Sequence, residues 1–136
     1  LDIWKPAEHN GTFRGNQLAF VGAKEAIKLN IELNLNNEVQ RKGEIVKEII
    51  EKEILPIDSK LTYRGIGLIW GIDFSNFENE GLSKIVANKC FEKGLIIERA
   101  GRKDVVLKIL PPLIIKDEEL INGLNIIKEA IKEVLN

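Results

Sequence analysis

Cysteine and histidine are almost missing from this chain of 136 residues. Cys90 is the only cysteine, His9 is the only histidine, and methionine is absent. A single cysteine permits no disulfide within the chain, which excludes a disulfide-stapled secreted scaffold and fits a cytoplasmic location. A single imidazole excludes a metal cluster built on several histidines. Because the first residue is not methionine either, we expect the chain to be cut from a longer protein.

Long hydrophobic runs and an excess of one charge are also absent. Hydrophobic residues make up 44% of the chain and charged residues 30%, with a formal net charge of -1. This balance gives no electrostatic reason to bind nucleic acid or an anionic membrane. Apolar runs such as residues 113–115 are far too short to cross a bilayer.

The spacing of apolar residues predicts two helices before any strand. From Asn16, a suitable N-cap, an apolar stripe predicts a helix whose tail includes residues 29–35. The alternation within 29–35 would by itself also fit a strand. A second helix is expected from an N-cap at Asn37 to Pro56, with Gln40 in the capping-box position.

Residues 64–74 change to a two-residue period, which predicts one strand with large side chains on one face. Three glycines on its other face indicate that something packs very close there. A helix is expected at 81–93, short strands at 95–98 and 105–110, and a last helix capped by Asp117. This order predicts an α+β fold, a small antiparallel-type sheet covered by helices.

Two segments stand out in a chain otherwise poor in catalytic patterns. Residues 11–16 lead into a helix, where backbone N–H groups and the Thr12 hydroxyl would suit a phosphate; a simple helix-entry turn is the alternative. Lys108 is a single cation within the apolar strand 105–110. It would point to solvent, or inward to receive a carboxylate. Cys90 is expected to fill the core rather than to act as a nucleophile.

Three blocks of the chain resemble conserved stretches of one enzyme family. Residues 8–16, EHNGTFRGN, resemble the stretch after the family's active-site lysine region. Residues 64–72, RGIGLIWGI, resemble its RG-x-GL-x-x-G strand, and residues 108–113, KILPPL, resemble its R-x-x-PPL strand. The blocks follow the family's order and are spread over nearly the entire chain, which therefore resembles the class III (omega-type) pyridoxal-phosphate-dependent aminotransferases. The sequence of residues 2–16 resembles one branch of this family in particular, a branch whose members share the same substrates.

The resemblance implies the C-terminal small domain of a fold-type I aminotransferase at 37–136. Before it, 1–36 would be the end of the large domain, with the glycine-rich loop and a long connecting helix. The resemblance also implies a homodimer with shared active sites, pyridoxal 5'-phosphate as cofactor, and amino and 2-oxo acids as substrates. Thr12 takes the place of a threonine that donates to the cofactor phosphate of the neighbouring subunit.

Two further positions carry expectations from the same resemblance. Lys108 takes the place of an arginine that binds the substrate α-carboxylate, although lysine cannot make arginine's two-point contact. Arg64 matches a position expected to be structural.

The resemblance also implies what this chain lacks. The family lysine that links covalently to the cofactor lies upstream of Leu1 in relatives, as does the aspartate that pairs with the pyridine nitrogen. No lysine here matches that motif. Because this lysine also moves the substrate proton, the chain alone is expected to be inactive. Two alternatives stay open: another substrate branch of the family, and a non-catalytic domain for dimerisation or ligand binding.

Overall fold

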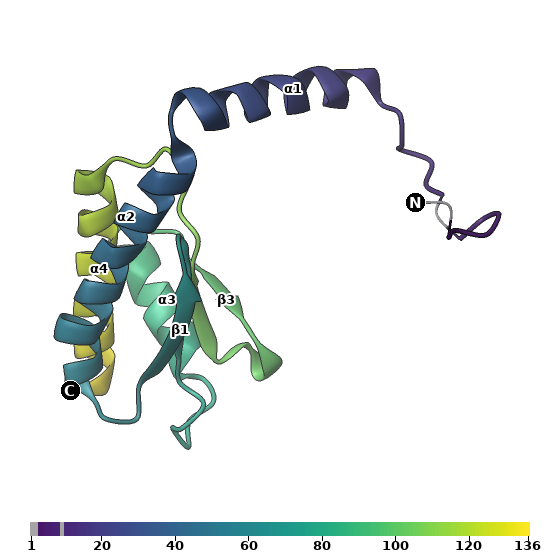
Figure 1. Cartoon of the computed structure of the whole chain (residues 1–136). Coiled ribbons are helices and arrows are strands. Elements are labelled where there is room, and N and C mark those ends of the chain that lie inside the picture. The colour runs from purple at the N-terminus through teal and green to yellow at the C-terminus, as the bar shows by residue number, and fades with distance from the viewer. Residues whose placement is uncertain (1–2, 9) are drawn as a thin grey trace. The chain divides into compact units, whose positions relative to one another are not determined.

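The computed structural model describes residues 3–8 and 10–136, which divide into two compact units (Figure 1). The first unit contains helix α1 (Gln17–Glu32) and ends at Leu35, and the second spans Asn36–Asn136. His9 lies outside the described residues. The assignment of the first part to the end of a larger domain stays a prediction.

Helix α1 begins where the sequence predicts. The Asn16 side-chain Oδ1 accepts the Ala19 N–H at 3.0 Å, which caps the first turn. The helix ends at Glu32 rather than at 35, because Asn34 adopts a φ of 48° that helical residues do not have. No residue of α1 is buried, although the helix carries many apolar side chains. The large exposed ones are Leu18, Phe20, Val21, Ile27, Leu29 and Ile31.

Helix α2 (Leu35–Ile49) starts two residues before the predicted cap at Asn37. That prediction was wrong because Asn34, in the left-handed conformation, already interrupts the helix, so α2 begins at the next residue. The helix continues as a short π-helical turn and a 3-10 turn that contains Pro56. Three fully buried residues form the inner stripe of this stretch: Val46, Ile50 and Ile54.

The single strand predicted at 64–74 is instead a β-hairpin. Strands β1 (Thr62–Ile66) and β2 (Ile69–Asp73) pair antiparallel, with Ile66 opposite Ile69. The two connecting residues are Gly67 and Leu68, and the φ of 56° at Gly67 suits the first central position of a type II′ turn. The alternation of large residues hides this turn, because Leu68 keeps the phase of the inward residues of β2.

Strands β3 (Glu98–Ala100) and β4 (Val106–Ile109) complete a four-stranded antiparallel sheet in the order β1-β2-β4-β3. β4 lies within the predicted range 105–110. β3 lies further along the chain than the predicted 95–98, because Leu95 and Ile97 pack against the core instead of pairing. The predicted polar turn after Glu98 is therefore partly strand.

The core lies between one sheet face and three helices: α2, α3 (Leu82–Glu92) and α4 (Asp117–Leu135). Helix α4 begins one residue after its cap, which is Lys116 and not the predicted Asp117. The predicted α+β fold, an antiparallel sheet covered by helices, is confirmed. In the described part of the chain, no helix has the length and hydropathy needed to cross a membrane. Core side chains of the sheet include Trp70, Ile72, Leu107 and Ile109.

The expectation of close packing at the glycines is confirmed, but Gly65 lies on the same face as its register partner Trp70 and not on the opposite face as predicted. A Cβ on Gly65 would lie 2.4 Å from the Trp70 ring, and one on Gly71 would lie 2.8 Å from Val106 Cγ1. Across the unit, a Cβ on Gly43 of α2 would lie 2.6 Å from the carbonyl oxygen of Gly67. The helix backbone and the hairpin turn therefore touch directly.

Candidate functional site

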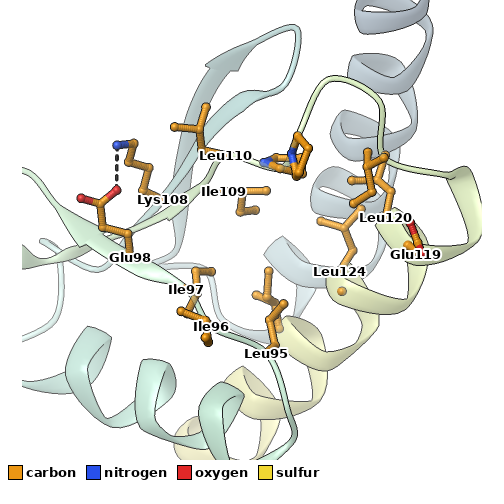
Figure 2. Close-up of a pocket in the computed structure, with 15 residues that line it drawn as sticks. Leu95, Ile96, Ile97, Glu98, Lys108, Ile109, Leu110, Glu119, Leu120 and Leu124 are labelled. Carbon is orange, nitrogen blue, oxygen red and sulfur yellow. Dashed lines mark hydrogen bonds and ion pairs between the residues drawn. The ribbon is translucent and has the colours of Figure 1, made fainter.

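A pocket of about 380 Å³ opens in the second unit beside the end of β4 (Figure 2). Its walls are β3 with the residues before it, β4, the start of α4, and the connection 110–116, which we name the proline loop. The lining is mostly apolar, with Glu98, Lys108 and Glu119 as its charged members. An apolar cavity with a few polar groups is the usual form of a small-molecule site.

Lys108 lies at one edge of this pocket and is already paired with a carboxylate. Because Leu107 and Ile109 face the core, Lys108 points to the opposite face of the sheet. Its Nζ lies 2.8 Å from Oε2 of Glu98, its register partner on β3. The Lys108 side chain is 32% exposed and that of Glu98 is 66% exposed. An ion pair this accessible is weak enough to exchange for another carboxylate.

Glu98 is a member of the site that the sequence analysis missed. Its partnership with Lys108 depends on the register of β3 against β4. The predicted strand 95–98 included Glu98, but its pairing with the strand of Lys108 was not predicted.

Thr12 belongs to the first unit and lies in an exposed turn just before α1. The Arg14 N–H donates to the Gly11 carbonyl at 3.2 Å, and Gly15 has a φ of 78°. The Thr12 side chain is therefore presented on a tight turn at a helix start. Lys108 belongs to the second unit, so the two predicted site residues fall in separate parts of the fold.

Arg64 has a structural contact, as expected for its position. Its Nη1 lies 2.7 Å from Oδ2 of Asp73, and Oδ1 of the same carboxylate accepts the Ser75 N–H at 2.8 Å. Burial acts to raise the pKa of Asp73, but the hydrogen bonds from Arg64 and Ser75 hold that pKa below its ordinary value. The contact fastens β1 to the end of β2.

Cys90 is buried in the core, as predicted. Burial raises the pKa of its thiol to about 11, so it remains protonated near neutral pH. Among residues 3–8 and 10–136, no group of three or more histidine, cysteine or acidic residues could hold a metal ion.

A family model described as aminotransferase class III matches residues 1–131 of the chain. The chain belongs to the class III aminotransferase family. The three blocks at 8–16, 64–72 and 108–113 all lie inside the matched range, so the resemblance read from them is confirmed.

Two relatives in this family share one name. The chain is 50% identical over 136 residues to diaminobutyrate–2-oxoglutarate transaminase of Wolinella succinogenes, covering 99% of the chain and 31% of the relative. It is 43% identical over 139 residues to the enzyme of the same name from Bordetella parapertussis, with coverage of 100% and 31%. The sequence of residues 2–16 resembles the same enzyme, diaminobutyrate–2-oxoglutarate transaminase.

Solved class III structures share the fold. Acetylornithine aminotransferase from Elizabethkingia anophelis has a TM-score of 0.81 and 27% identity, over 97% of this chain and 32% of that one. Ornithine aminotransferase from Toxoplasma gondii has a TM-score of 0.82 and 26% identity, over 96% and 30%. The chain thus spans less than a third of the length of these proteins.

Proposed function

We propose that this chain is the C-terminal part of a diaminobutyrate–2-oxoglutarate transaminase. The parent protein would transfer an amino group from glutamate to aspartate semialdehyde, giving 2,4-diaminobutyrate for ectoine synthesis. The observation that carries the proposal is the 50% identity to the Wolinella succinogenes enzyme along 99% of the chain. Acetylornithine and 4-aminobutyrate transaminases are the alternative branches, and the acetylornithine enzyme compared above is only 27% identical.

Lys108 is proposed to bind a substrate carboxylate at the edge of the pocket. Three observations support this role: its position in the KILPPL block, its orientation away from the core, and its exchangeable pair with Glu98. A substrate carboxylate would replace Glu98 as the partner of the ammonium group. Lysine offers a point charge, whereas arginine offers a planar fork of donors. Lys108 would therefore attract the substrate carboxylate without setting its orientation as an arginine would.

The cofactor of the parent protein is proposed to be pyridoxal 5'-phosphate. Thr12, exposed on its tight turn, fits one hydrogen bond to the phosphate, donated to the cofactor of the neighbouring subunit in a homodimer. When bound, this cofactor carries the amino group and withdraws electrons from the substrate α-carbon. Since the chain matches only 31% of its relatives' length, most contacts to the cofactor would come from other residues.

The chain alone is proposed to be inactive, because none of its lysines matches the family's cofactor-binding motif. We expect no transaminase activity from it and no cofactor absorbance that survives dialysis. Absorbance that persists after dialysis would contradict this and would favour a different cofactor site. The parent protein is proposed to act in the cytoplasm.

The test of the substrate assignment uses the full-length protein with a panel of amino donors. We expect turnover of 2,4-diaminobutyrate with 2-oxoglutarate to exceed that of acetylornithine and 4-aminobutyrate by at least about tenfold in kcat/KM, a difference of about 1.4 kcal/mol in transition-state stabilisation. Preference for either alternative donor would reassign the branch. No turnover of any donor by a folded, cofactor-loaded protein would favour the non-catalytic alternative.

The test of Lys108 is its replacement by methionine, which keeps the length and removes the charge. We expect KM for glutamate to rise by about tenfold or more, as for loss of a charge-assisted hydrogen bond. Lys52→Met is the matched control, because Lys52 pairs only along its own helical segment, with Glu48 at 2.5 Å. Unchanged KM in Lys108→Met would remove Lys108 from the binding site.

A further inference from the structure

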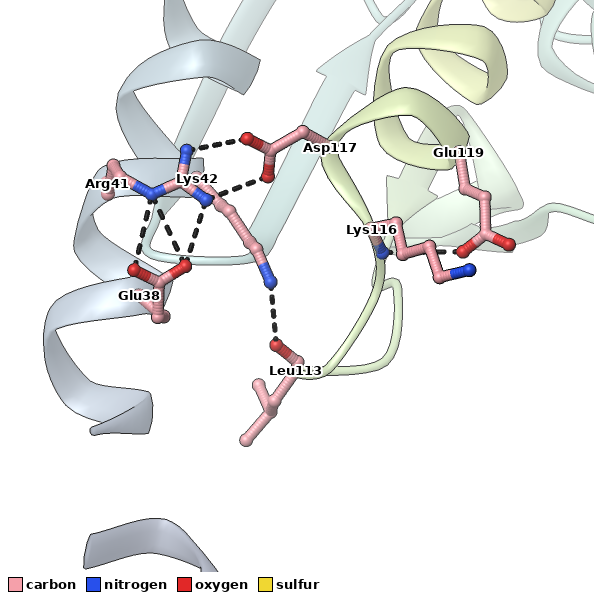
Figure 3. Close-up of polar contacts among 7 residues, drawn as sticks. All are labelled: Glu38, Arg41, Lys42, Leu113, Lys116, Asp117 and Glu119. Atoms are coloured by element: carbon pink, nitrogen blue, oxygen red, sulfur yellow. Dashed lines mark hydrogen bonds and ion pairs between the residues drawn. The ribbon is translucent and has the colours of Figure 1, made fainter. Parts of the chain in front are cut away.

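The proline loop is fastened to α2 by two neighbouring residues, Arg41 and Lys42 (Figure 3). Lys42 reaches the middle of the loop, and Arg41 reaches Asp117, the first residue of α4 after the loop. Both contacts join residues more than 70 positions apart in the sequence. One short stretch of α2 therefore holds the loop at two points.

Lys42 makes the inner contact. Its Nζ donates to the carbonyl oxygen of Leu113 at 3.3 Å, and the residue is only 6% exposed. Burying an ammonium group costs free energy, so a buried lysine is held where its hydrogen bond has a defined partner. That partner is a backbone carbonyl of the proline loop.

Arg41 makes the outer contact with both of its terminal nitrogens. Nη1 and Nη2 each lie 2.8 Å from a carboxylate oxygen of Asp117, and Nη2 also lies 2.9 Å from Oε2 of Glu38. A two-point contact fixes the angle between the groups as well as their distance. Arg41 thereby ties the start of α4, and with it the end of the loop, to α2.

The loop held in this way forms one wall of the pocket and continues directly from the strand of Lys108. Leu110, Pro111 and Pro112 line the cavity, and Leu110 is only two residues beyond Lys108. A shift of the loop would move this wall and the end of β4 together. Within the loop, the Ile115 N–H donates to the Pro112 carbonyl at 3.0 Å, so its backbone has a defined fold that can be monitored.

We propose that Arg41 and Lys42 are positioning residues for substrate binding: they clamp the proline loop and so fix the pocket wall beside Lys108. This inference rests on the proposed function, because it assumes that Lys108 meets a substrate carboxylate. Neither residue touches the substrate. The clamp acts through the loop backbone and through the start of α4.

The first test measures hydrogen exchange of the Ile115 amide in the chain. Lys42→Met removes the bond to Leu113 while filling the same volume, and we expect exchange at Ile115 to become about tenfold faster. Lys52→Met serves as control and should leave this amide unchanged. Unchanged exchange at Ile115 in Lys42→Met would overturn the clamp.

The second test measures steady-state kinetics of the full-length transaminase carrying the same substitutions. For Lys42→Met we expect KM for glutamate to rise by about fivefold to tenfold, with kcat within about twofold. A residue that only braces the fold would lower the amount of active protein and leave KM unchanged. Faster exchange with unchanged KM would therefore overturn the positioning role.

Arg41→Lys protects the test against a Lys42 variant that fails to fold. It keeps the charge of an exposed side chain but loses the two-point contact with Asp117 and the guanidinium contacts with Glu38, so we expect a KM increase of about threefold. No increase in this variant would also count against the clamp. The Lys108→Met result stands apart: an unchanged KM there refutes the carboxylate site, whatever the exchange at Ile115 shows.

Discussion

Adding one methyl group at Gly43 is expected to destabilise the second unit, whereas the same change at Gly123 is expected to stabilise it. Both glycines lie within helices, Gly43 in α2 and Gly123 in α4. Alanine improves helix propensity by about 1 kcal/mol at either place. The two variants also restrict the unfolded chain equally, so these contributions cancel when they are compared.

The contacts of the new methyl group decide the sign. At Gly123 its nearest neighbour would be Leu95 Cδ1 at 3.8 Å, an ordinary distance. At Gly43 it would lie 2.6 Å from the Gly67 carbonyl oxygen, whereas carbon and oxygen atoms in contact normally lie at about 3.3–3.6 Å. The helix and the hairpin must therefore separate by about 0.7 Å, and forced repacking of this kind costs about 1–3 kcal/mol.

Urea unfolding followed by circular dichroism and tryptophan fluorescence measures the comparison. We expect Gly123→Ala to gain up to about 1 kcal/mol of unfolding free energy and Gly43→Ala to lose about 1 kcal/mol. In a unit of this size, 1 kcal/mol corresponds to about 4–8 °C in Tm. If Gly43→Ala proves as stable as Gly123→Ala, then the backbone contact does not limit the approach of α2 to the hairpin.

Two further predictions concern titratable groups. Because the pKa of Asp73 is lower in the folded state than the unfolded value of about 3.9, its charge adds stability above that pH, which is lost as pH falls through the folded pKa. Asp73→Asn should therefore flatten the acid side of a stability–pH curve, and an unchanged curve would contradict this contribution. For Cys90, whose pKa is raised to about 11 by burial, a thiol reagent at pH 8 should react only as fast as the chain unfolds. Rapid labelling of the folded chain would show that this part of the core is open.

The fold class followed from the sequence because its helices and strands have clear apolar periods. The hairpin did not, since the turn at Gly67–Leu68 leaves the alternation of large residues unbroken. A two-residue period identifies the face of each residue but does not reveal where the strand reverses. The early start of α2 was missed for a related reason: the left-handed conformation falls on Asn34, and the residue types of Asn36 and Asn37 would suit it equally well.

The candidate site could be predicted only where a local motif carried it. Thr12 and Lys108 lie in blocks that resemble the family, so their residue types and neighbours were informative. Glu98, Arg41 and Lys42 have no such motif. Their importance depends on strand register and on contacts between residues far apart in the chain, which only the folded arrangement provides.

The apolar surface of α1 bears on how this polypeptide behaves in solution. An isolated helix of 16 residues is only marginally stable in water. Helix α1 buries none of its side chains within the chain. A helix with apolar residues on several sides normally belongs in a protein interior. We therefore expect the helix content of residues 17–32 to rise when their apolar side chains pack against another protein surface. A measurement of that helix content would report this association and not the intrinsic stability of the chain.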